Sequence, residues 1–492
     1  MLVALRGTTL TRSFLLGLLT GVIYFTGTLY WITRVMVRYG DLPPAVGVLV
    51  NAVLVAYLSF FPAIFALAIR RITIAHGPRT ISAAPLVWIA TELGRNYPFG
   101  GFPWVLLGYS QVTVLPIAQF ASIFGVYGVS MLVASVSTAL AMAVPGSGRM
   151  PLSVRRATRK YEPFLPLAVV LIAVFTVAVW GARRAAGAEW TRAGEPIRIG
   201  MIQGNVSLEE RLDPARRSQI FTNYVAMTRR AIREGADFVI WPESATPFQF
   251  ERDTLAAAQI RTIAQQARVP ILLGSDEVVQ HDNPPEELYY NSAFLVRADG
   301  TNGGGYRKMH LVPFGEYVPA KWLFSFAGKL VENVSDFSAG QTATLLPVGR
   351  HNISTAICYE VVYPDLVRQF VTGGSELLTT ITNDAWFGET SAPYQHFEQA
   401  AMRAIEEGRY LVRAANTGVS GIVDPYGRVL ERTAIFQPAV LVGEARFLTA
   451  STFYARHGDL LPYAALVVVL LLVASARRGR AKLPGPRAAE GS

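Results

Sequence analysis

The chain has 492 residues, of which 51% are hydrophobic and only 16% are charged, against roughly 25% charged residues in ordinary soluble domains. Its net charge is +10, but Lys and Arg cluster beside long uncharged segments, as topology signals do in membrane proteins, so we expect no nucleic acid partner. A single cysteine excludes an intrachain disulfide, and without a Cys/His ligand set we expect no metal site and no cofactor.

Long uncharged segments near both ends predict membrane spans, because about 20 apolar residues are needed to cross a bilayer. The predicted spans are residues 14–32, 46–69, 81–93, 112–144, 164–180 and 460–476. The third is the weakest, since it is short and contains Glu92. An acidic residue in a span suggests either a function or, in the setting "TELGR", a place at the membrane interface. The fourth is too long for one helix, so we expect part of it to lie outside the membrane.

Basic residues predict the orientation, since loops rich in Lys and Arg stay in the cytoplasm. Such loops follow the second, fourth and last spans, at residues 70–79, 149–160 and 477–487. Both ends would therefore be cytoplasmic, and the charged middle would face away from the cytoplasm. We predict an N-terminal membrane domain of about five spans (1–184), an outer-facing catalytic domain (185–455), and a C-terminal transmembrane helix with a basic tail (456–492).

The middle of the chain alternates short apolar runs with amphipathic stretches. The runs predict strands at residues 197–201, 238–241, 271–274, 293–296, 353–358 and 377–381, and the stretches predict helices at 215–234 and 254–267. This alternation is typical of an α/β fold, in which catalytic groups usually follow the C-terminal ends of strands.

Three predicted strand ends carry reactive residues. Glu243 lies in "VIWPESATP", Lys308 in "YRKMHLVPFGEYVP" and Cys358 in "TAICYE". Each has an ordinary explanation alone: a solvated glutamate, a surface lysine and a small buried hydrophobe. Together they form the set that thiol catalysis needs, because a thiol nucleophile requires a base for its proton and a cation for the developing negative charge.

The order Glu–Lys–Cys with these flanks resembles the nitrilase (carbon–nitrogen hydrolase) superfamily. Longer motifs resemble one of its families, the apolipoprotein N-acyltransferases of Gram-negative bacteria: "GFPWVLLGYSQ", "HLVPFGEYVP", "AICYE", "TNDAWFG" and "QHFEQAAMRAIEEGR". The resemblance covers nearly the whole chain. It implies a nitrilase-like αββα sandwich domain inserted between transmembrane helices.

The resemblance also implies roles for single residues. Cys358 would be the nucleophile and carry an acyl chain as a thioester, and Glu243 would be the general base. Lys308 would stabilise the oxyanion together with a backbone N–H, that of Tyr359. Glu316 matches a second glutamate of the family, which would orient Lys308 or relay protons.

Three further matches are less directly chemical. Tyr359 and Glu360 match positions that support the nucleophile. Trp104 matches a tryptophan near the lipid entrance, although an ordinary tryptophan of the membrane interface explains it equally well. The aromatic stretch "WLFSFAGKL", residues 322–330, is either a lid that dips into lipid or a packed loop.

The activity that the resemblance implies moves a fatty acyl chain from a phospholipid to the α-amino group of a diacylglyceryl-modified N-terminal cysteine on an apolipoprotein. The chain would lie in the bacterial inner membrane with its catalytic domain in the periplasm. Two alternatives remain open: a membrane-tethered nitrilase-type amidohydrolase, and a non-catalytic membrane scaffold. Family members usually have two further spans before the first one seen here. Either this lineage lost that pair or the true start lies upstream of Met1, and we expect the second.

Overall fold

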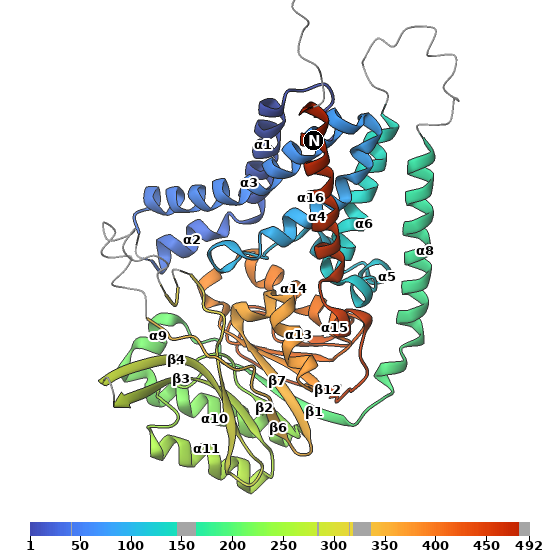
Figure 1. Ribbon diagram of the computed structural model, residues 1–492. Helices are drawn as coiled ribbons and strands as arrows, with labels where there is room; N and C mark the ends of the chain where they lie inside the picture. The colour runs from blue at the N-terminus through green and yellow to red at the C-terminus, as the bar shows by residue number, and fades with distance from the viewer. Residues whose placement is uncertain (41, 145–163, 283–284, 314, 318–335, 482–492) are drawn as a thin grey trace, which may run out of the picture.

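A layer of helices stands on an α/β domain built from two β-sheets (Figure 1). The computed structural model describes residues 1–492 except 41, 145–163, 283–284, 314, 318–335 and 482–492. The predicted lid, residues 322–330, lies outside the described residues.

Four helical segments of the described chain are long and apolar enough to cross a membrane. They are α1 (Leu10–Thr28), α3 (Pro44–His76), α6 (Ala121–Ala143) and the stretch Leu165–Thr191, which contains α8 (Leu165–Gly187). The last helix, α16 (Leu460–Ala481), has a shorter apolar part, Leu460–Ala476. The predicted spans at 14–32, 46–69 and 164–180 thus correspond to long apolar helices.

The other two predicted spans differ in detail. Residues 81–93 form the end of a 3-10 helix (Pro78–Ala83) and an 11-residue helix, α4 (Ala84–Gly94). At 1.5 Å per residue α4 is only about 16 Å long, roughly half the hydrocarbon thickness, so it does not cross by itself. Residues 112–144 divide as expected, because a short helix, α5 (Leu115–Ala118), precedes α6.

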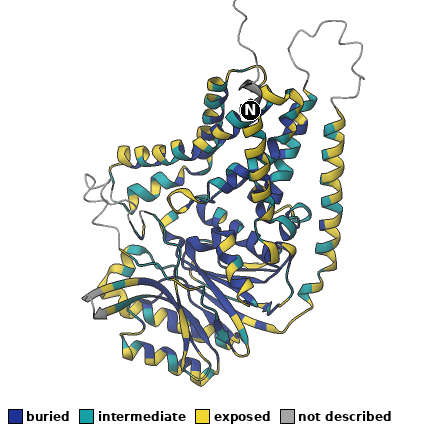
Figure 2. Ribbon diagram, viewed as in Figure 1, coloured by how far each residue is buried: buried dark blue, intermediate teal, exposed yellow. Residues whose placement is uncertain are grey.

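Apolar side chains face outward along the helical layer. Figure 2 shows α8 exposed along most of its length, and its Ile172, Phe175 and Leu165 are each more than 60% exposed. Apolar surface of this extent is rare on soluble monomers and marks contact with a membrane or a partner. Together with the four long apolar helices, it indicates that a bilayer surrounds this layer.

The α/β domain contains two six-stranded sheets. The first has the order β12 (Ala439–Arg446), β1 (Pro196–Gln203), β2 (Phe238–Ile240), β3 (Ile271–Asp282), β4 (Pro285–Val296), β5 (Asn302–Arg307). The second has the order β11 (Val429–Arg432), β10 (Gly421–Val423), β9 (Leu411–Ala415), β8 (Leu377–Thr382), β7 (His351–Ile357), β6 (Leu346–Val348). Strands β1–β3 are parallel, as are β7–β9.

Helices cover the outer face of each sheet and so complete four layers. Helices α10 (Arg217–Arg233) and α11 (Thr254–Ala267) pack on the first sheet, while α13 (Pro364–Thr372) and α14 (Ala392–Glu407) pack on the second (Figure 1). Because β8 is covered on both faces, all six of its residues are buried. The αββα sandwich expected from the sequence is therefore present.

The second sheet's helices face the helical layer, and α14 is joined to α6. Helix α6 is interrupted at Gly125, which has a φ of +64°, so the N–H of Val126 lacks a normal helical partner. The Glu406 carboxylate of α14 accepts that N–H at 2.7 Å, and Arg403 pairs with Glu406 at 3.0 Å. The N terminus and the C-terminal ends of α3, α6 and α16 lie at the side of the helical layer far from the sheets (Figure 1).

Candidate active site

Glu243 and Lys308 lie at one edge of the first sheet. Glu243 follows β2 and Lys308 directly follows β5; because β4 is antiparallel to both β3 and β5, the ends of β2 and β5 meet at the same edge. The Lys308 ammonium is 3.5 Å from the Glu243 carboxylate, and Lys308 is only 1% exposed. The two sequence-predicted groups are thus in contact in a dry environment.

Glu316 completes a buried charge cluster around Lys308. Its carboxylate is 2.8 Å from Lys308 Nζ, closer than that of Glu243, and its other oxygen accepts the N–H of Val312 at 2.8 Å. The side-chain amide of Asn291, on β4, donates to Glu243 at 2.7 Å and to Glu316 at 3.0 Å. One amide therefore holds both carboxylates in position beside the lysine.

Cys358 comes from the second sheet, at the first residue after β7. Its φ is +53°, in the left-handed region that side chains other than glycine rarely adopt. The chain turns there into a short 3-10 helix, Cys358–Val362, which includes Tyr359 and Glu360. Both Glu243 and Lys308 lie close enough to Cys358 for their charges to act on its thiol. The three residues predicted from the strand ends converge where the sheets meet.

The electrostatics keep the thiol protonated in the resting site. Burial raises the pKa of the Cys358 thiol, and the Glu243 carboxylate raises that pKa further, although Lys308 opposes both. Burial also raises the pKa of Glu243 above its ordinary 4.5, against the opposing effect of Lys308. Burial lowers the pKa of Lys308, but Glu316 and Glu243 outweigh it, so the net shift is upward and the ammonium stays charged. Of the two carboxylates whose charges act on the thiol, Glu243 has a raised pKa and Asp384 a lowered one.

Glu360 joins the nucleophile turn to the segment after Lys308. One carboxylate oxygen accepts the N–H groups of Met309 and His310 at 2.7 and 3.1 Å and the hydroxyl of Tyr306 at 2.7 Å. The other accepts the N–H of Ile357 at 2.7 Å. Glu360 thus holds the turn of Cys358 against the segment that follows Lys308; the supporting role that the resemblance implies stays a prediction.

Tyr359 and Trp104 connect the site to the helical layer. Their rings stack with centroids 6.0 Å apart and an interplanar angle of 19°. Trp104 is 1% exposed, and its indole N–H donates to Gln395 at 2.8 Å. The ring of Trp31, at the start of α2 (Trp31–Arg38), has its centroid 5.4 Å from that of the Trp104 ring. Trp104 thus faces the nucleophile turn from the helical side; a role at a lipid entrance stays a prediction.

Sequence reasoning missed several buried polar residues. Asn291 lies within a long strand, where no local pattern distinguishes it. Asn383, after β8, donates its backbone N–H to Glu243 at 2.7 Å, and His396, on α14, contacts the carbonyl of Cys358 at 3.1 Å. Asn383 and His396 do lie in sequence motifs, "TNDAWFG" and "QHFEQAAMRAIEEGR". These motifs indicate the family but not the contact that either side chain makes.

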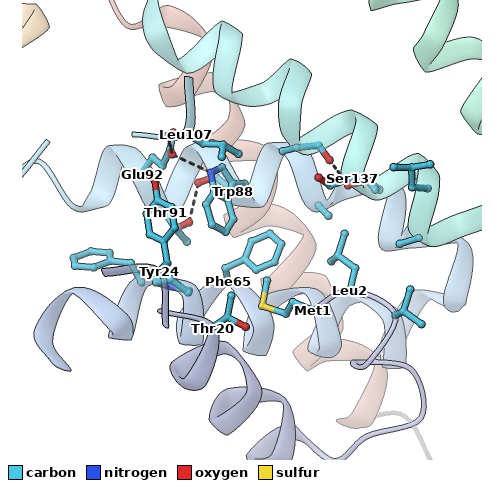
Figure 3. A pocket seen from close by; sticks show the side chains of 18 of the residues that line it. Met1, Leu2, Thr20, Tyr24, Phe65, Trp88, Thr91, Glu92, Leu107 and Ser137 are labelled. Atoms are coloured by element: carbon cyan, nitrogen blue, oxygen red, sulfur yellow. Dashed lines mark hydrogen bonds between the residues drawn. The ribbon is translucent and has the colours of Figure 1, made fainter. Parts of the chain in front are cut away.

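A cavity of about 520 Å³ lies apart from this site, among α1, α3, α4 and α6 (Figure 3). Its wall includes Tyr24, Phe65 and Trp88 together with Glu92. The Glu92 carboxylate accepts the Trp88 indole N–H at 3.0 Å and the Leu107 N–H at 2.7 Å. Glu92 therefore fastens the segment that follows Trp104 to α4, which gives this buried acid a structural role.

The domain consists of two facing sheets, with Glu243 and Lys308 in contact at the edge of one and Cys358 directly after a strand of the other, and it belongs to the carbon–nitrogen hydrolase class. The family model described as "Carbon-nitrogen hydrolase" matches residues 198–449, and the model "Apolipoprotein N-acyltransferase N-terminal domain" matches residues 1–139. The chain belongs to the apolipoprotein N-acyltransferase family, whose members combine these two parts.

Two relatives of known family support this assignment. The chain is 39% identical to the apolipoprotein N-acyltransferase of Geobacter metallireducens, over 95% of this chain and 87% of that protein. It is 34% identical to that of Methylococcus capsulatus, over 96% and 88%. A crystal structure of an amidase from Nesterenkonia sp. aligns with 52% of this chain and 93% of its own at 22% identity and a TM-score of 0.38.

Proposed function

We propose that this membrane acyltransferase moves a fatty acyl chain from a phospholipid to the α-amino group of a diacylglyceryl-modified N-terminal cysteine of an apolipoprotein, through a thioester on Cys358. The observation that carries the proposal is the buried contact of Lys308 with Glu243 and Glu316 beside the Cys358 turn, on the side of the domain that faces the apolar helices. Membership of the family supports the proposed class of substrates, and this geometry supports the proposed chemistry.

The first half-reaction forms the thioester. Glu243 accepts the thiol proton while Cys358 Sγ bonds to the ester carbonyl carbon of the phospholipid. The oxyanion that develops is stabilised by the Lys308 ammonium and the N–H of Tyr359, which belongs to the first turn of a 3-10 helix, where N–H groups lack intrahelical partners. The bond from carbon to the glycerol oxygen then breaks, and Glu243 returns the proton to that oxygen, releasing a lysophospholipid.

The second half-reaction transfers the acyl group to nitrogen. The apolipoprotein amine attacks the thioester carbon and gives a proton to Glu243, the bond from sulfur to carbon breaks, and Glu243 reprotonates the thiolate. An amide is more stable than the starting ester, which makes the overall direction favourable. In this scheme Glu316, at 2.8 Å from Lys308, holds the ammonium in place through both steps.

We also propose that the chain lies in the bacterial inner membrane with the catalytic domain in the periplasm. Basic residues of the segment 70–79 and of 477–481 lie at or after the ends of α3 and α16, and these helix ends lie away from the sheets (Figure 1). Positively charged loops favour the cytoplasm. Both substrates are lipids, and drawing an acyl chain into water costs about 0.8 kcal/mol per CH₂. A site at the outer surface of that membrane avoids this cost.

Intact mass spectrometry after incubation with phospholipid tests the proposal. The purified chain should gain one acyl mass, lose it with hydroxylamine, and transfer it to a synthetic diacylglyceryl-cysteine peptide. Cys358→Ser should gain no such mass while keeping the melting behaviour of the parent. Release of free fatty acid with no acyl transfer to the peptide would instead indicate a hydrolase, and a Cys358→Ser variant with full transfer activity would refute the thioester.

A further inference from the structure

The carbonyl of the nucleophile itself is held by a buried imidazole. His396 Nε2 lies 3.1 Å from the Cys358 oxygen, and His396 is 0% exposed. A carbonyl oxygen only accepts hydrogen bonds, so Nε2 carries the hydrogen in this contact. The contact with the Cys358 carbonyl therefore identifies the His396 tautomer as the one that is protonated at Nε2.

Arg413 and Asp384 hold the opposite side of the ring. Arg413 Nη2 lies 3.0 Å from His396 Nδ1 and 2.9 Å from Asp384 Oδ2, and all three side chains are buried. A guanidinium only donates, so the Nδ1 lone pair faces Arg413. The other oxygen of Asp384, 3.0 Å from Nδ1, accepts the Thr382 hydroxyl at 2.9 Å. If the ring gained a second proton, Nδ1 would donate to Asp384 and Nε2 would still donate to Cys358.

The pKa values agree with the neutral form. Burial lowers the pKa of His396, and the Arg413 cation lowers it further. For Asp384, burial acts upward, but the pKa falls to about 2 with the Arg413 cation as the largest opposing cause, so the carboxylate stays charged and balances Arg413.

The backbone at Cys358 needs such a restraint. Its φ of +53° is a strained conformation that persists only where the surroundings fix it. On the preceding residue, the N–H of Ile357 is bound by Glu360 at 2.7 Å. On Cys358, the carbonyl is bound by His396. The turn is thus fixed on both sides of the nucleophile.

We propose that His396 is a positioning residue that aims the oxyanion donor: by binding the Cys358 carbonyl, it sets the plane of the peptide between Cys358 and Tyr359. That peptide is planar and trans, so its C=O and N–H point in opposite directions. Fixing the oxygen toward His396 fixes the Tyr359 N–H toward the other side, where an acyl oxygen would sit. The inference rests on the proposed function in assigning that N–H to the oxyanion.

Two reactions of Cys358 separate this role from a merely structural one. Alkylation by iodoacetamide displaces iodide at a saturated carbon and develops no oxyanion. Acylation by a p-nitrophenyl ester forms the bond from sulfur to carbon, passes through a tetrahedral oxyanion, and expels p-nitrophenolate while Glu243 takes the thiol proton. His396→Phe keeps a ring without the donor, and His396→Gln keeps an N–H donor.

We expect His396→Phe to slow acylation about 10- to 100-fold, less than the 10²–10³ lost with an oxyanion donor itself, and to leave alkylation unchanged. His396→Gln should recover most of the acylation rate. Equal loss in both reactions, or no loss in either, would overturn the proposal. Because the ester is not a lipid, failure of phospholipid transfer in the parent chain would reject the proposed function without touching this result.

A second measurement on the unaltered chain covers the case in which His396→Phe does not fold. Nitrogen NMR of protein labelled with ¹⁵N-histidine reports which ring nitrogen is protonated, and the His396 signal is the one absent from His396→Gln. A protonated Nε2 is expected. A bare Nε2 would overturn the proposal.

Discussion

The carboxylate of Glu360 accepts the backbone N–H of Met309 at 2.7 Å, and this bond links the two sheets at the site. Met309 follows Lys308 at the end of β5, whereas Glu360 belongs to the turn that begins with Cys358. Glu360 therefore ties the segment that carries Lys308 to the turn that carries Cys358.

Replacing Glu360 by glutamine should damage both folding and acylation. The carboxylate accepts three N–H groups and one hydroxyl, and an amide would present its own N–H₂ to some of these donors. Each buried donor left unsatisfied costs about 1–3 kcal/mol. A lower melting temperature and slower thioester formation are expected. Glu444→Gln, at an exposed pair with Arg446, is the matched control, and equal behaviour of the two variants would contradict the prediction.

Asn291→Leu should move the acid limb of the pH–rate profile, where the rate of thioester formation falls with falling pH, to higher pH. Glu243 has to be ionised to accept the thiol proton, so activity is lost as the pH falls through the Glu243 pKa, which burial raises above 4.5. The Asn291 amide binds the charged carboxylate and lowers that pKa. Without the amide the pKa rises further. The pH profile of thioester formation measures the shift, and Asn223→Leu, at an exposed position of α10, should leave the profile unmoved.

Glu316→Gln should move the same limb in the opposite direction. The Glu316 charge raises the pKa of Glu243, so its removal lowers that pKa and extends activity to lower pH. The maximal rate should nevertheless fall roughly 10- to 100-fold, less than for loss of an oxyanion donor, because Lys308 loses its closest carboxylate. Glu277→Gln, which removes the partner of the adjacent Arg307, is the control. A limb that moves upward would show that Glu316 acts on Glu243 in another way.

Trp104→Ala should be far more harmful than Trp180→Ala. Trp104 is buried against Tyr359, and truncating a buried tryptophan typically costs about 3–5 kcal/mol. Trp180, on α8, is 37% exposed. Thermal unfolding in detergent and the rate of thioester formation should both drop for Trp104→Ala only. Similar losses in the two variants would mean that Trp104 supports nothing beyond local packing.

Much of the fold could be predicted from local patterns. The amphipathic stretch 254–267 coincides with α11, and the apolar run 377–381 lies within β8. Such elements can be predicted because the spacing of apolar residues indicates a helix or a strand and shows which side of it is buried. Segment 81–93 shows the limit, because composition alone did not reveal that its α-helical part is the 11-residue α4.

The residues of the site also fall into two groups, those that local sequence patterns predict and those that they do not. Glu243, Lys308 and Cys358 can be singled out from sequence because each follows a predicted strand, and Glu243 meets Lys308 because β2 and β5 end at the same edge of the first sheet. Asn291 and His396 are not found in this way. Their roles depend on which atoms lie within about 3 Å across different layers, and that is a property of packing between elements distant in sequence.

The break in α6 has a consequence for biosynthesis. The N–H of Val126 is satisfied by Glu406, which is translated 280 residues later. At about 5–20 residues per second, the ribosome needs roughly 15–60 s to cover that distance. During this interval the freed amide lacks its partner from the catalytic domain, and an unpaired backbone N–H away from water costs free energy. The Val126 N–H therefore needs another hydrogen-bond acceptor, such as water or the insertion machinery, until Glu406 of the catalytic domain has been synthesised.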